Sequence, residues 1–349
     1  MKSELAATNA IGCPEKELLP FVRRLLSPEK VLGMNRIGRG QSNPTYALHC
    51  AQRKLVLRSK PPGVLLRSAH LVEREFRVMS ALRHTAVPVP EMVALVNDGE
   101  SPLGRAFYIM EFVDGDVHFD PFLPELDVSG RRVVYDEMNR VLTEIHGVDA
   151  TAVGLSEFGR PGNYFARQTA KWKRQYYAAR ITPNRDMDKL ADWLEANMVE
   201  NDKAANLVHG DYRLDNLIFG RTSLRVLAVV DWELSTLGHP MADIAYQCMQ
   251  WRMSHEGPLR GLGGVCRSEW GLPKERQYLE DYCRRRRIPV PKNWSFYLVF
   301  SFFRFAAILE GVGRRAIEGN AANPEMAVEY GKQVPMLARA AMEALDQES

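Results

Sequence analysis

The stretch that decides the fold of this chain runs His209-Gly210-Asp211-Tyr212-Arg213-Leu214-Asp215-Asn216, and Asp231-Trp232-Glu233 follows fifteen residues after it. Short apolar segments at 207–208 and 217–219 flank the first stretch, so we expect a polar loop between two strands. Phosphoryl transfer requires such side chains: one carboxylate orients or deprotonates the attacking hydroxyl, while an amide oxygen and a second carboxylate hold Mg²⁺ on the nucleotide phosphates. We therefore predict that Asp211 is the base and that Asn216 and Asp231 are the Mg²⁺ ligands.

The spacing of these residues matches the catalytic loop of protein kinases, H-R-D-x-x-x-x-N followed by D-F-G. Asp211 and Asn216 keep that spacing, Gly210 replaces the arginine, and Asp-Trp-Glu replaces Asp-Phe-Gly. We expect Arg213 to steady the moving phosphoryl group and His209 to brace the loop by hydrogen bonds. The alternative is a plain polar turn with Asp and Asn as turn formers. It is disfavoured because the flanking strands are the context that the motif requires.

Strand patterns dominate the first third of the chain. Residues 31–57 have the pattern of a hairpin and a further strand, residues 69–82 that of an amphipathic helix, and residues 91–96 and 106–112 that of strands. Long helical patterns begin after residue 113, first at 131–146 and then at 164–197. We therefore predict an α+β fold with a strand-rich lobe of residues 1–112, a helical lobe of residues 113–349, and a ligand cleft at their junction.

The composition is typical of a folded globular protein, with 349 residues, 46% hydrophobic and 26% charged. A net charge of +3 gives no reason to expect nucleic acid or a membrane surface as a partner. Five scattered cysteines without a CxxC pair, and an N-terminus without an apolar signal core, favour the cytoplasm. The most apolar run, residues 294–309, contains Arg304 and is shorter than the roughly 20 residues of a membrane span, which favours a buried helix.

The chain resembles the aminoglycoside-phosphotransferase-like kinases, which share a two-lobed protein-kinase-like fold and carry Gly in place of the catalytic-loop Arg. It is most similar to the branch that includes the phosphotransferase domains of acyl-CoA dehydrogenase family members ten and eleven and bacterial hydroxyacyl-CoA kinases. The strings that carry this resemblance are Gly40-Gln41-Ser42-Asn43-Pro44-Thr45-Tyr46, Leu57-Arg58-Ser59-Lys60-Pro61-Pro62-Gly63, Arg74-Glu75-Phe76, Phe158-Gly159-Arg160-Pro161-Gly162-Asn163-Tyr164 with Arg167-Gln168 and Trp172, and Phe303-Arg304-Phe305-Ala306-Ala307-Ile308. The resemblance implies ATP as the phosphoryl donor and a hydroxyl of a small molecule as the acceptor.

A Gly-rich turn in the first lobe is expected to cover the nucleotide phosphates. Gly38, Gly40, Ser42 and Asn43 belong to this turn, and glycine lets backbone N–H groups approach an anion closely. An ordinary two-glycine β-turn is the alternative. The backbone of Glu111 and Val113, at the end of the lobe, is expected to bind the adenine edge.

The phosphate clamp departs from the protein-kinase pattern, in which a strand Lys pairs with a helix Glu. Arg58 occupies that strand position, and we expect Glu75 rather than Glu73 as its partner. Alternation along the strand places Lys54 and Lys60 on the same face as Arg58, so either lysine could share or take the role.

The acceptor side gives no sign of a pocket for polycations. Residues 240–349 hold 15 basic against 13 acidic side chains. Arg160, Arg167 and Arg304, with Arg252 and the run 284–287, are candidates to receive a carboxylate or a phosphate-bearing acceptor such as an acyl-CoA. For the four-Arg run, a solvated helix end is the alternative; for Arg304, a buried structural ion pair is the alternative.

We therefore predict an ATP- and Mg²⁺-dependent phosphotransferase acting on a hydroxyl of a small molecule, with a hydroxyacyl-CoA as the expected acceptor. An aminoglycoside or amino-sugar kinase and an ATP-binding pseudokinase module are the two alternatives. A pseudokinase usually lacks one of Asp211, Asn216 and Asp231, whereas this chain has all three. The choice of ATP or GTP, the position of the hydroxyl and the oligomeric state stay open.

Overall fold

A computed structural model describes residues 15–37, 43–62, 71–199, 204–319, 321 and 323–346. The chain divides into two compact units, Met1–Arg83 with Pro90–Val113, and His84–Val89 with Asp114–Ser349. The predicted lobes, residues 1–112 and 113–349, differ from this division at Val113 and at the segment His84–Val89. That segment groups with the second unit, where the carbonyl of Pro88 accepts a hydrogen bond from Val229 N at 2.9 Å.

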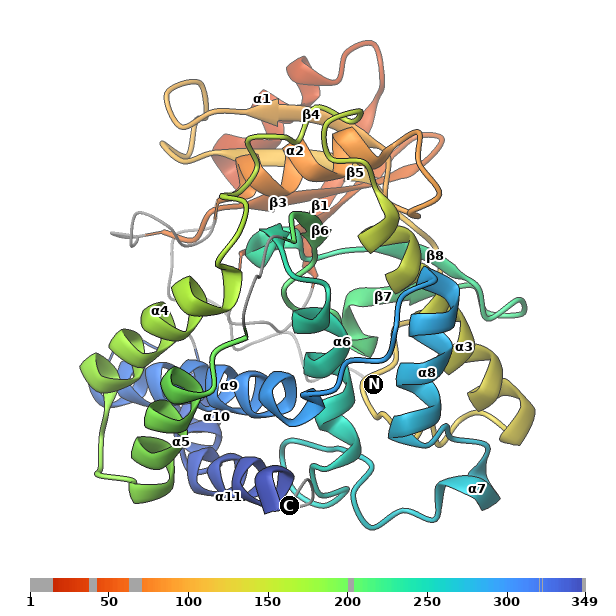
Figure 1. The fold of residues 1–349 in the computed structure, drawn as a ribbon. Helices are drawn as coiled ribbons and strands as arrows, with labels where there is room; N and C mark the ends of the chain where they lie inside the picture. Colours follow the sequence, from red (N-terminus) through yellow and green to blue (C-terminus); the bar gives the residue numbers. More distant parts are fainter. Residues whose placement is uncertain are drawn as a thin grey trace. The chain divides into compact units, whose positions relative to one another are not determined.

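The first unit is built on a five-stranded antiparallel sheet in the order β1-β2-β3-β5-β4. Its strands and helices are α1 (Glu15–Leu25), β1 (Val31–Ile37), β2 (Thr45–Cys50), β3 (Lys54–Ser59), α2 (Val72–Leu82), β4 (Met92–Val96) and β5 (Phe107–Glu111). The predicted hairpin, third strand and helix are therefore present, and they are coloured red to orange in Figure 1.

The two faces of this sheet follow the alternation of β3 and β5. Leu55 and Leu57 join a buried cluster with Leu18 and Val22 of α1. Arg58 and Tyr108, which pair across β3 and β5, lie on the opposite face with Glu75 of α2. Alternation thus directs the apolar side chains to one helix and the polar ones to the other.

Two small antiparallel sheets position the motif residues in the second unit. β6 (Asn206–Val208) pairs with β9 (Thr236–Gly238), and β7 (Leu217–Phe219) pairs with β8 (Val226–Val229). The 3₁₀ turn η1 (Leu214–Asn216) leads into β7, and η2 (Trp232–Leu234) follows β8. The loop between β6 and β7 is therefore fixed at both ends by strands, as its sequence predicts.

Helices form the rest of the second unit: α3 (Val128–Gly147), α4 (Tyr164–Ala179), α5 (Arg185–Ala196), α6 (Met241–Cys248), η3 (Met249–Trp251), α7 (Arg267–Trp270), α8 (Glu275–Arg286), α9 (Trp294–Ile317), α10 (Pro324–Gly331) and α11 (Val334–Asp346). The helical pattern at 164–197 is two helices rather than one. α5 starts anew after Pro183, because the side chain of Asn184 caps it by accepting from Asp186 N and Met187 N.

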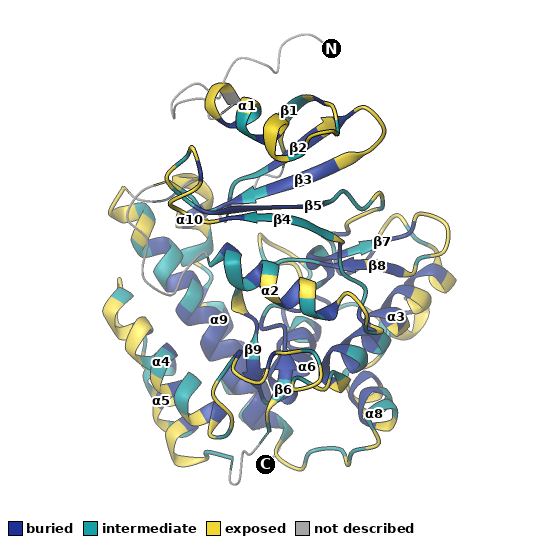
Figure 2. Ribbon diagram, turned by 90° about the horizontal axis from the view of Figure 1, so that it is seen from above, coloured by how far each residue is buried: buried dark blue, intermediate teal, exposed yellow. Residues whose placement is uncertain are grey.

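Helix α9 is the centre of the helical part. α4, α5, α6, α10 and α11 pack around it, and its ribbon is largely dark blue in Figure 2. Length and composition alone would let α9 cross a membrane, but 83% of its most apolar window is buried inside the protein. Such burial is typical of a core helix, which agrees with the sequence-based expectation.

Candidate active site

A buried carboxylate, Asp243 of α6, holds the start of the loop between β6 and β7. Its oxygens accept hydrogen bonds from the backbone N–H groups of His209, at 2.6 Å, and Gly210, at 2.8 Å. His146 of α3 donates a third through Nε2 at 3.1 Å. Burial disfavours the charged form of Asp243, but these contacts outweigh it and the pKa of Asp243 lies below its ordinary value.

Gly210 is required by the path of this loop. Its φ is +84°, and a Cβ atom there would lie 2.5 Å from the backbone oxygen of Leu234. A side chain at this position would have to displace backbone and adopt a left-handed conformation. The protein-kinase arginine therefore does not fit at residue 210.

The carboxylate of Asp211 is kept ionised by its neighbours. Burial opposes ionisation most strongly, but the charge of Arg213 and a hydrogen bond from the Tyr246 hydroxyl together hold the pKa of Asp211 below its ordinary value. Arg213 Nε lies 3.5 Å from Asp211 Oδ1. A carboxylate in this state can accept a proton or orient a hydroxyl.

Asn216 is oriented by the same carboxylate. Its amide nitrogen donates to the backbone oxygen of Asp211 at 2.8 Å and to Asp211 Oδ2 at 3.1 Å. With the nitrogen committed to Asp211, the amide oxygen is the atom left to bind a metal. Asn216 itself is buried, so the amide is held in this orientation by its surroundings.

Asp231 is brought close to Asn216 by the β7–β8 pairing. Val230 N donates to the backbone oxygen of Asn216 at 3.0 Å, and Asp231 follows directly with a left-handed φ of 65°. The two residues thus leave adjacent strands at the same end of the sheet. An amide oxygen and a carboxylate are hard oxygen ligands of the kind that Mg²⁺ prefers, so this donor set fits that ion.

His209 connects the two segments that carry these ligands. Its Nε2 donates to Val230 O at 3.0 Å, and its Nδ1 accepts from Asp211 N at 3.2 Å. The ring is fully buried against Trp232, with 4.6 Å between ring centroids. His209 is therefore the structural brace that the sequence analysis expects.

Arg213 bridges two acids of the loop. Besides Asp211, it contacts Asp215 through Nη2 at 2.6 Å. The structure places its charge beside the predicted base, and its role toward a phosphoryl group stays a prediction.

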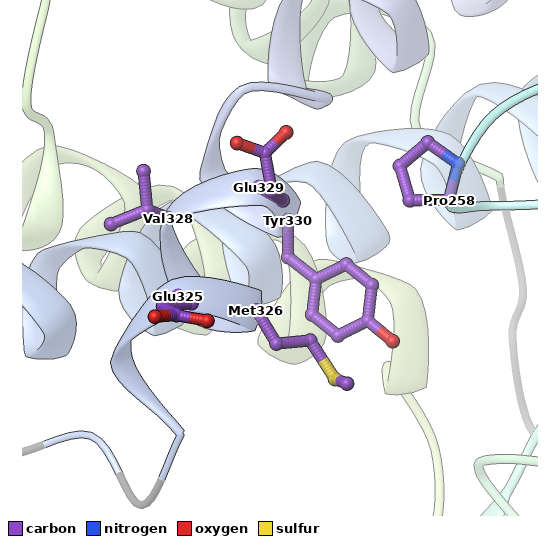
Figure 3. A pocket seen from close by; sticks show the side chains of 6 residues that line it. All are labelled: Pro258, Glu325, Met326, Val328, Glu329 and Tyr330. Carbon is purple, nitrogen blue, oxygen red and sulfur yellow. The ribbon is translucent and has the colours of Figure 1, made fainter.

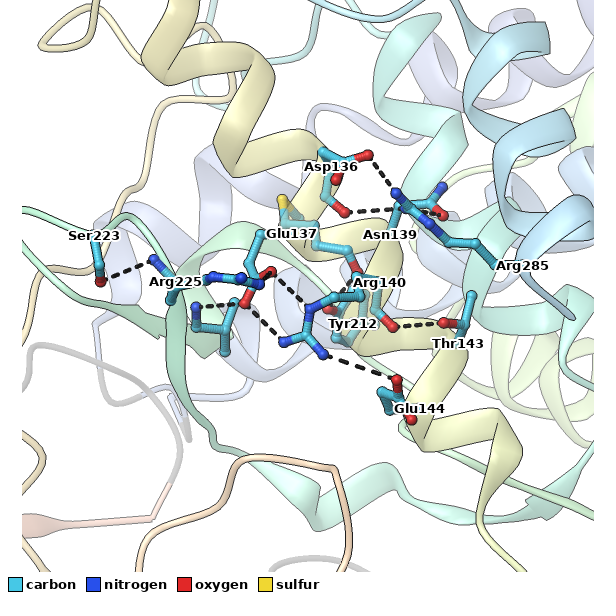
Figure 4. Close-up of polar contacts among 12 residues, drawn as sticks. Asp136, Glu137, Asn139, Arg140, Thr143, Glu144, Tyr212, Ser223, Arg225 and Arg285 are labelled. Atoms are coloured by element: carbon cyan, nitrogen blue, oxygen red, sulfur yellow. Dashed lines mark hydrogen bonds and ion pairs between the residues drawn. The ribbon is translucent and has the colours of Figure 1, made fainter.

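A polar network holds β8, the strand before Asp231, against helix α3 (Figure 4). The buried carboxylate of Glu137 accepts from Arg140 Nε at 2.8 Å, from Arg225 Nη1 at 3.0 Å and from Val226 N at 3.1 Å. In the same place, the hydroxyl of Tyr212 donates to the backbone oxygen of Met138. One helix thus anchors both the predicted catalytic loop and the strand that leads to Asp231, the second predicted ligand.

The first unit supplies the predicted nucleotide side. Arg58 Nε lies 3.3 Å from Glu75 Oε1, and Glu75 is fully buried. The carboxylate also accepts from Asn43 Nδ2 at 2.9 Å and from the Tyr108 hydroxyl at 3.2 Å. Glu75, rather than Glu73, is therefore the partner of Arg58.

The other candidates for the phosphate clamp have partners of their own. Lys60 forms ion pairs with Glu73 and with Asp98, and Lys54 lies over the ring of Phe112. Gly38, Gly40 and Ser42 of the predicted phosphate-covering turn lie outside the described residues. Glu111 is the last residue of β5, and Val113 follows two positions later.

The predicted acceptor arginines have different surroundings. Arg160 is exposed, and Arg167 donates to the backbone oxygens of Arg160 and Gly162, so it orders the loop before α4. The run 284–287 at the end of α8 is largely engaged: Arg284 pairs with Asp281, and Arg285 with Asp136. Neither arrangement leaves an evident anion site.

Arg304 lies directly behind the catalytic loop. Its Nη2 donates to the backbone oxygen of Gly210, and its guanidinium lies over the rings of Trp172, at 5.5 Å, and Tyr246, at 5.1 Å. Sequence reasoning missed Tyr246, which lies under Arg304, and Lys171, which lies over Trp172. A signal for Tyr246 was present, because it follows Asp243 by three residues and so lies near it on one helix face.

Comparison with known proteins agrees with this geometry. The profile of the phosphotransferase enzyme family APH matches residues 33–288. The chain belongs to the phosphotransferase enzyme family. This phosphotransferase is 44% identical over 316 residues to acyl-CoA dehydrogenase family member 10 of Mus musculus, a match that covers 90% of the chain and 29% of that protein. It is 40% identical over 326 residues to the probable acyl-CoA dehydrogenase IBR3 of Arabidopsis thaliana, covering 88% of the chain and 39% of that protein.

Solved structures confirm the two-lobed, kinase-like α+β fold. A protein from Ralstonia eutropha, provisionally named an aminoglycoside phosphotransferase, matches with a TM-score of 0.84 and 43% identity, covering 95% of this chain and 98% of the other. Aminoglycoside phosphotransferase APH(4)-Ia, in a ternary complex with AMP-PNP and hygromycin B, matches with a TM-score of 0.60 and 16% identity over 92% and 97% of the two chains. The second likeness concerns the fold alone. The phosphotransferase spans well under half the length of the two acyl-CoA dehydrogenase relatives.

Proposed function

We propose that this phosphotransferase transfers the γ-phosphoryl group of ATP to a hydroxyl of a hydroxyacyl-CoA. The observation that carries the proposal is the ionised carboxylate of Asp211, which Arg213, Tyr246 and Asn216 surround. Asp231 lies close by, because Val230 N bonds to the backbone oxygen of Asn216. This is the arrangement that phosphoryl transfer to an alcohol requires.

In the proposed reaction, Asp211 accepts the hydroxyl proton of the acceptor. The acceptor oxygen forms a bond to the γ-phosphorus, and the bond from that phosphorus to the β–γ bridging oxygen breaks, so ADP leaves with the electron pair. Arg213 keeps the carboxylate of Asp211 ionised and in place. Arg58, oriented by Glu75 in the first unit, is proposed to bind phosphate oxygens.

Asn216, through its amide oxygen, and Asp231 would hold Mg²⁺. When bound, the ion neutralises charge on the transferring phosphates. The chain's contribution is to fix both ligands: the β7–β8 pairing sets their separation, and Asp211 sets the orientation of the Asn216 amide.

Two observations support an acyl-CoA acceptor over a polycationic one. The relatives at 44% and 40% identity are named as acyl-CoA dehydrogenases. In addition, Arg304 contacts the loop that carries Asp211 and Lys171 lies near Arg304, and cations there would repel an aminoglycoside. The provisional name of the Ralstonia protein keeps the aminoglycoside kinase as the second candidate. We also propose that the protein works in the cytoplasm.

The test is a mass-spectrometric assay with ATP or GTP, Mg²⁺ and 3-, 4- and 5-hydroxyacyl-CoA esters. We expect a CoA ester heavier by one phosphoryl group. In Asp211→Asn the rate should fall by about 10²- to 10⁴-fold, the range expected for loss of a general base, while the protein stays folded. Asp281→Asn is the control, because it makes the same change outside the catalytic loop, at a carboxylate that pairs with Arg284, and it should cost far less.

Wild-type turnover in Asp211→Asn would refute the mechanism. Protection of cells against aminoglycosides, without any phosphorylated CoA ester, would favour the second candidate. Nucleotide binding without transfer to any acceptor would favour a pseudokinase module.

A further inference from the structure

Four side chains from three helices form a basic–aromatic cluster beside the catalytic loop: Lys171 and Trp172 of α4, Tyr246 of α6 and Arg304 of α9. Lys171 Nζ lies 4.7 Å from the ring centroid of Trp172. The guanidinium of Arg304 lies over that ring and over the ring of Tyr246, as described above. Two cations and two aromatic rings therefore share one small volume of the second unit.

The two cations of the cluster lack ion-pair partners in the described structure, although the charge of Arg304 helps to lower the pKa of Asp211. Arg304 is only 4% exposed, yet within the described part of the chain neither Arg304 nor Lys171 forms an ion pair with a carboxylate. The hydrogen bond from Arg304 goes to a backbone oxygen, that of Gly210. A buried, unpaired charge is costly, so such a pair of cations calls for a negative partner.

Two buried donors of the cluster also lack hydrogen-bond acceptors in the described structure. They are Arg304 Nε and Trp172 Nε1. Native proteins satisfy almost all buried polar groups, so each unsatisfied donor calls for an explanation, of which a role in the reaction is one. Burial, and then the charge of Arg304, lower the pKa of Lys171, which agrees with positive charge left uncompensated.

Tyr246 connects this cluster to the predicted base. Its ring faces Arg304, and its hydroxyl lies close enough to Asp211 to lower the pKa of that carboxyl. The cluster and the carboxylate of Asp211 are thus in contact with the same side chain. When the hydroxyl of an acceptor lies at Asp211, another atom of that acceptor, a few bonds from the hydroxyl, would lie at the cluster.

We propose that the basic–aromatic cluster binds an acceptor oxygen that carries partial or full negative charge, a few bonds from the hydroxyl that is phosphorylated. For the hydroxyacyl-CoA of the proposed function, on which this inference rests, that oxygen is the thioester carbonyl. Arg304 Nε and Trp172 Nε1 donate to it, and Lys171 supplies charge. The cluster then selects acceptors with a carbonyl or carboxylate near the hydroxyl and rejects cationic ones.

Two other places among the described residues of the second unit do not suit such an oxygen. A hollow at α10 is lined by Pro258, Glu325, Met326, Val328, Glu329 and Tyr330 (Figure 3). It presents two carboxylates and no cation, so it does not suit an oxygen that carries negative charge. In the run 284–287, Arg284 and Arg285 already pair with Asp281 and Asp136.

A matched pair of acceptors tests the proposal: a hydroxyacyl-CoA thioester and the corresponding thioether, which keeps the hydroxyl and the CoA phosphates but lacks the carbonyl. Lys171→Met and Trp172→Phe are the variants, and KM and kcat are measured for each acceptor and for ATP. We expect KM for the thioester to rise about tenfold in each variant, the size of one lost charge-assisted or buried hydrogen bond. KM for the thioether and for ATP should not change.

Lys173→Met is the control, because Lys173 lies on the same helix but pairs with Glu195 and Asp192. It should leave all constants unchanged. Equal effects of Lys171→Met on thioester and thioether would overturn the carbonyl assignment and point to a CoA phosphate. Unchanged KM values in both variants would overturn the subsite altogether.

A CoA-free probe separates this inference from the proposed function. Calorimetric titration with 4-hydroxybutyrate, whose carboxylate carries a full charge, should show binding that Lys171→Met weakens and Lys173→Met does not. If no CoA ester is phosphorylated but this binding pattern holds, the acceptor assignment fails and the subsite stands. If 4-hydroxybutyrate binds wild type and Lys171→Met alike, or binds neither, the subsite fails.

Discussion

Asp211, the predicted base, is surrounded by side chains that favour its ionised form. Arg213 contributes charge, Asn216 contributes a hydrogen bond to Oδ2, and Tyr246 contributes a hydroxyl donor. Because all three favour the ionised form, the base is charged even though burial disfavours it. Removing any single donor should therefore raise the pKa of Asp211.

We predict that Tyr246→Phe lowers kcat by about tenfold. A hydrogen bond to a charged group contributes about 1.5–3 kcal/mol, so its loss leaves the carboxylate less firmly positioned. KM for ATP should not change, because Tyr246 belongs to the second unit and Arg58 to the first. Steady-state kinetics would measure both constants. Tyr177→Phe is the control, since the hydroxyl of Tyr177 bonds to Asp188 at 3.0 Å on the surface; a tenfold loss there would show that the effect is nonspecific.

The catalytic loop and the β7–β8 sheet are the elements that turn separate side chains into a site. Asp243 and His209 fix the loop by hydrogen bonds to its backbone and to Val230, while Glu137 of α3 holds β8. The loop can pass so close to η2 only because residue 210 lacks a Cβ atom. Backbone geometry at this scale therefore controls where Asp211 and Asp231 lie.

Gly210→Ala should disable the enzyme while leaving it folded. A left-handed backbone costs an L-residue about 1–2 kcal/mol, and contact with Leu234 O moves the loop further. We expect at least a tenfold loss in kcat and a fall in Tm of about 2–4 °C per kcal/mol lost. Gly154→Ala separates the two effects, because Gly154 has a φ of +75° but nothing within 4 Å of its Cβ position. Gly154→Ala should lower Tm but leave kcat unchanged. A normal kcat in Gly210→Ala would show that the close approach at Leu234 does not position Asp211.

Glu137→Gln should weaken the anchoring of β8. Burial opposes the charged form of Glu137, yet hydrogen bonds from Arg140 and Val226 N hold its pKa below the ordinary value. In Glu137→Gln, Arg140 and Arg225 lose their negatively charged partner, so we expect a lower Tm. Because β8 leads to Asp231, we also expect a higher Mg²⁺ concentration for half-maximal activity. Glu144→Gln is the control, because Glu144 is more exposed and 3.9 Å from Arg140. Equal effects of the two variants would refute a special role for Glu137.

At the scale of the whole molecule, the core beneath the loop links stability to pH. His146 is fully buried, with Nδ1 2.6 Å from the Tyr282 hydroxyl and Nε2 on Asp243. Burial, which outweighs the attraction of Asp243, holds the pKa of His146 below its ordinary value. There is therefore a pH range in which the imidazole is neutral in the folded protein but protonated in the unfolded chain.

The sign of the pH effect follows. As pH falls through about 6.5, the unfolded chain takes up a proton at His146 and the folded protein does not, so the free energy of unfolding decreases, by at most about 1.4 kcal/mol per pH unit. The lowered pKa of Asp243 acts only at more acidic pH, below about 3.9. We expect Tm to fall between about pH 7.5 and pH 5.5, and to fall less in His146→Gln. An identical pH dependence in both proteins would contradict this account.

Local patterns in the sequence determined much of the fold and of the candidate site. Strand alternation, helical periodicity and the Asp211–Asn216 spacing are properties of short segments, so they identify the sheet of the first unit and the loop between β6 and β7. Alternation also places Arg58 on the face of β3 that meets Glu75, because side chains two residues apart share a face. The family and the kinase-like fold follow from the same motifs and are confirmed by the comparisons.

Only the tertiary structure decided what surrounds those motifs. Lys171, Tyr246 and Arg304 are separated by at least 58 residues in the chain, and packing of α4, α6 and α9 brings them together behind Gly210. No short-range pattern predicts such a cluster, since the periodicity of each helix places its own residue without reference to the other two helices. The same reason explains why Arg167 and the run 284–287 could not be assigned beforehand: an arginine's function depends on which acid or backbone oxygen the fold brings beside it.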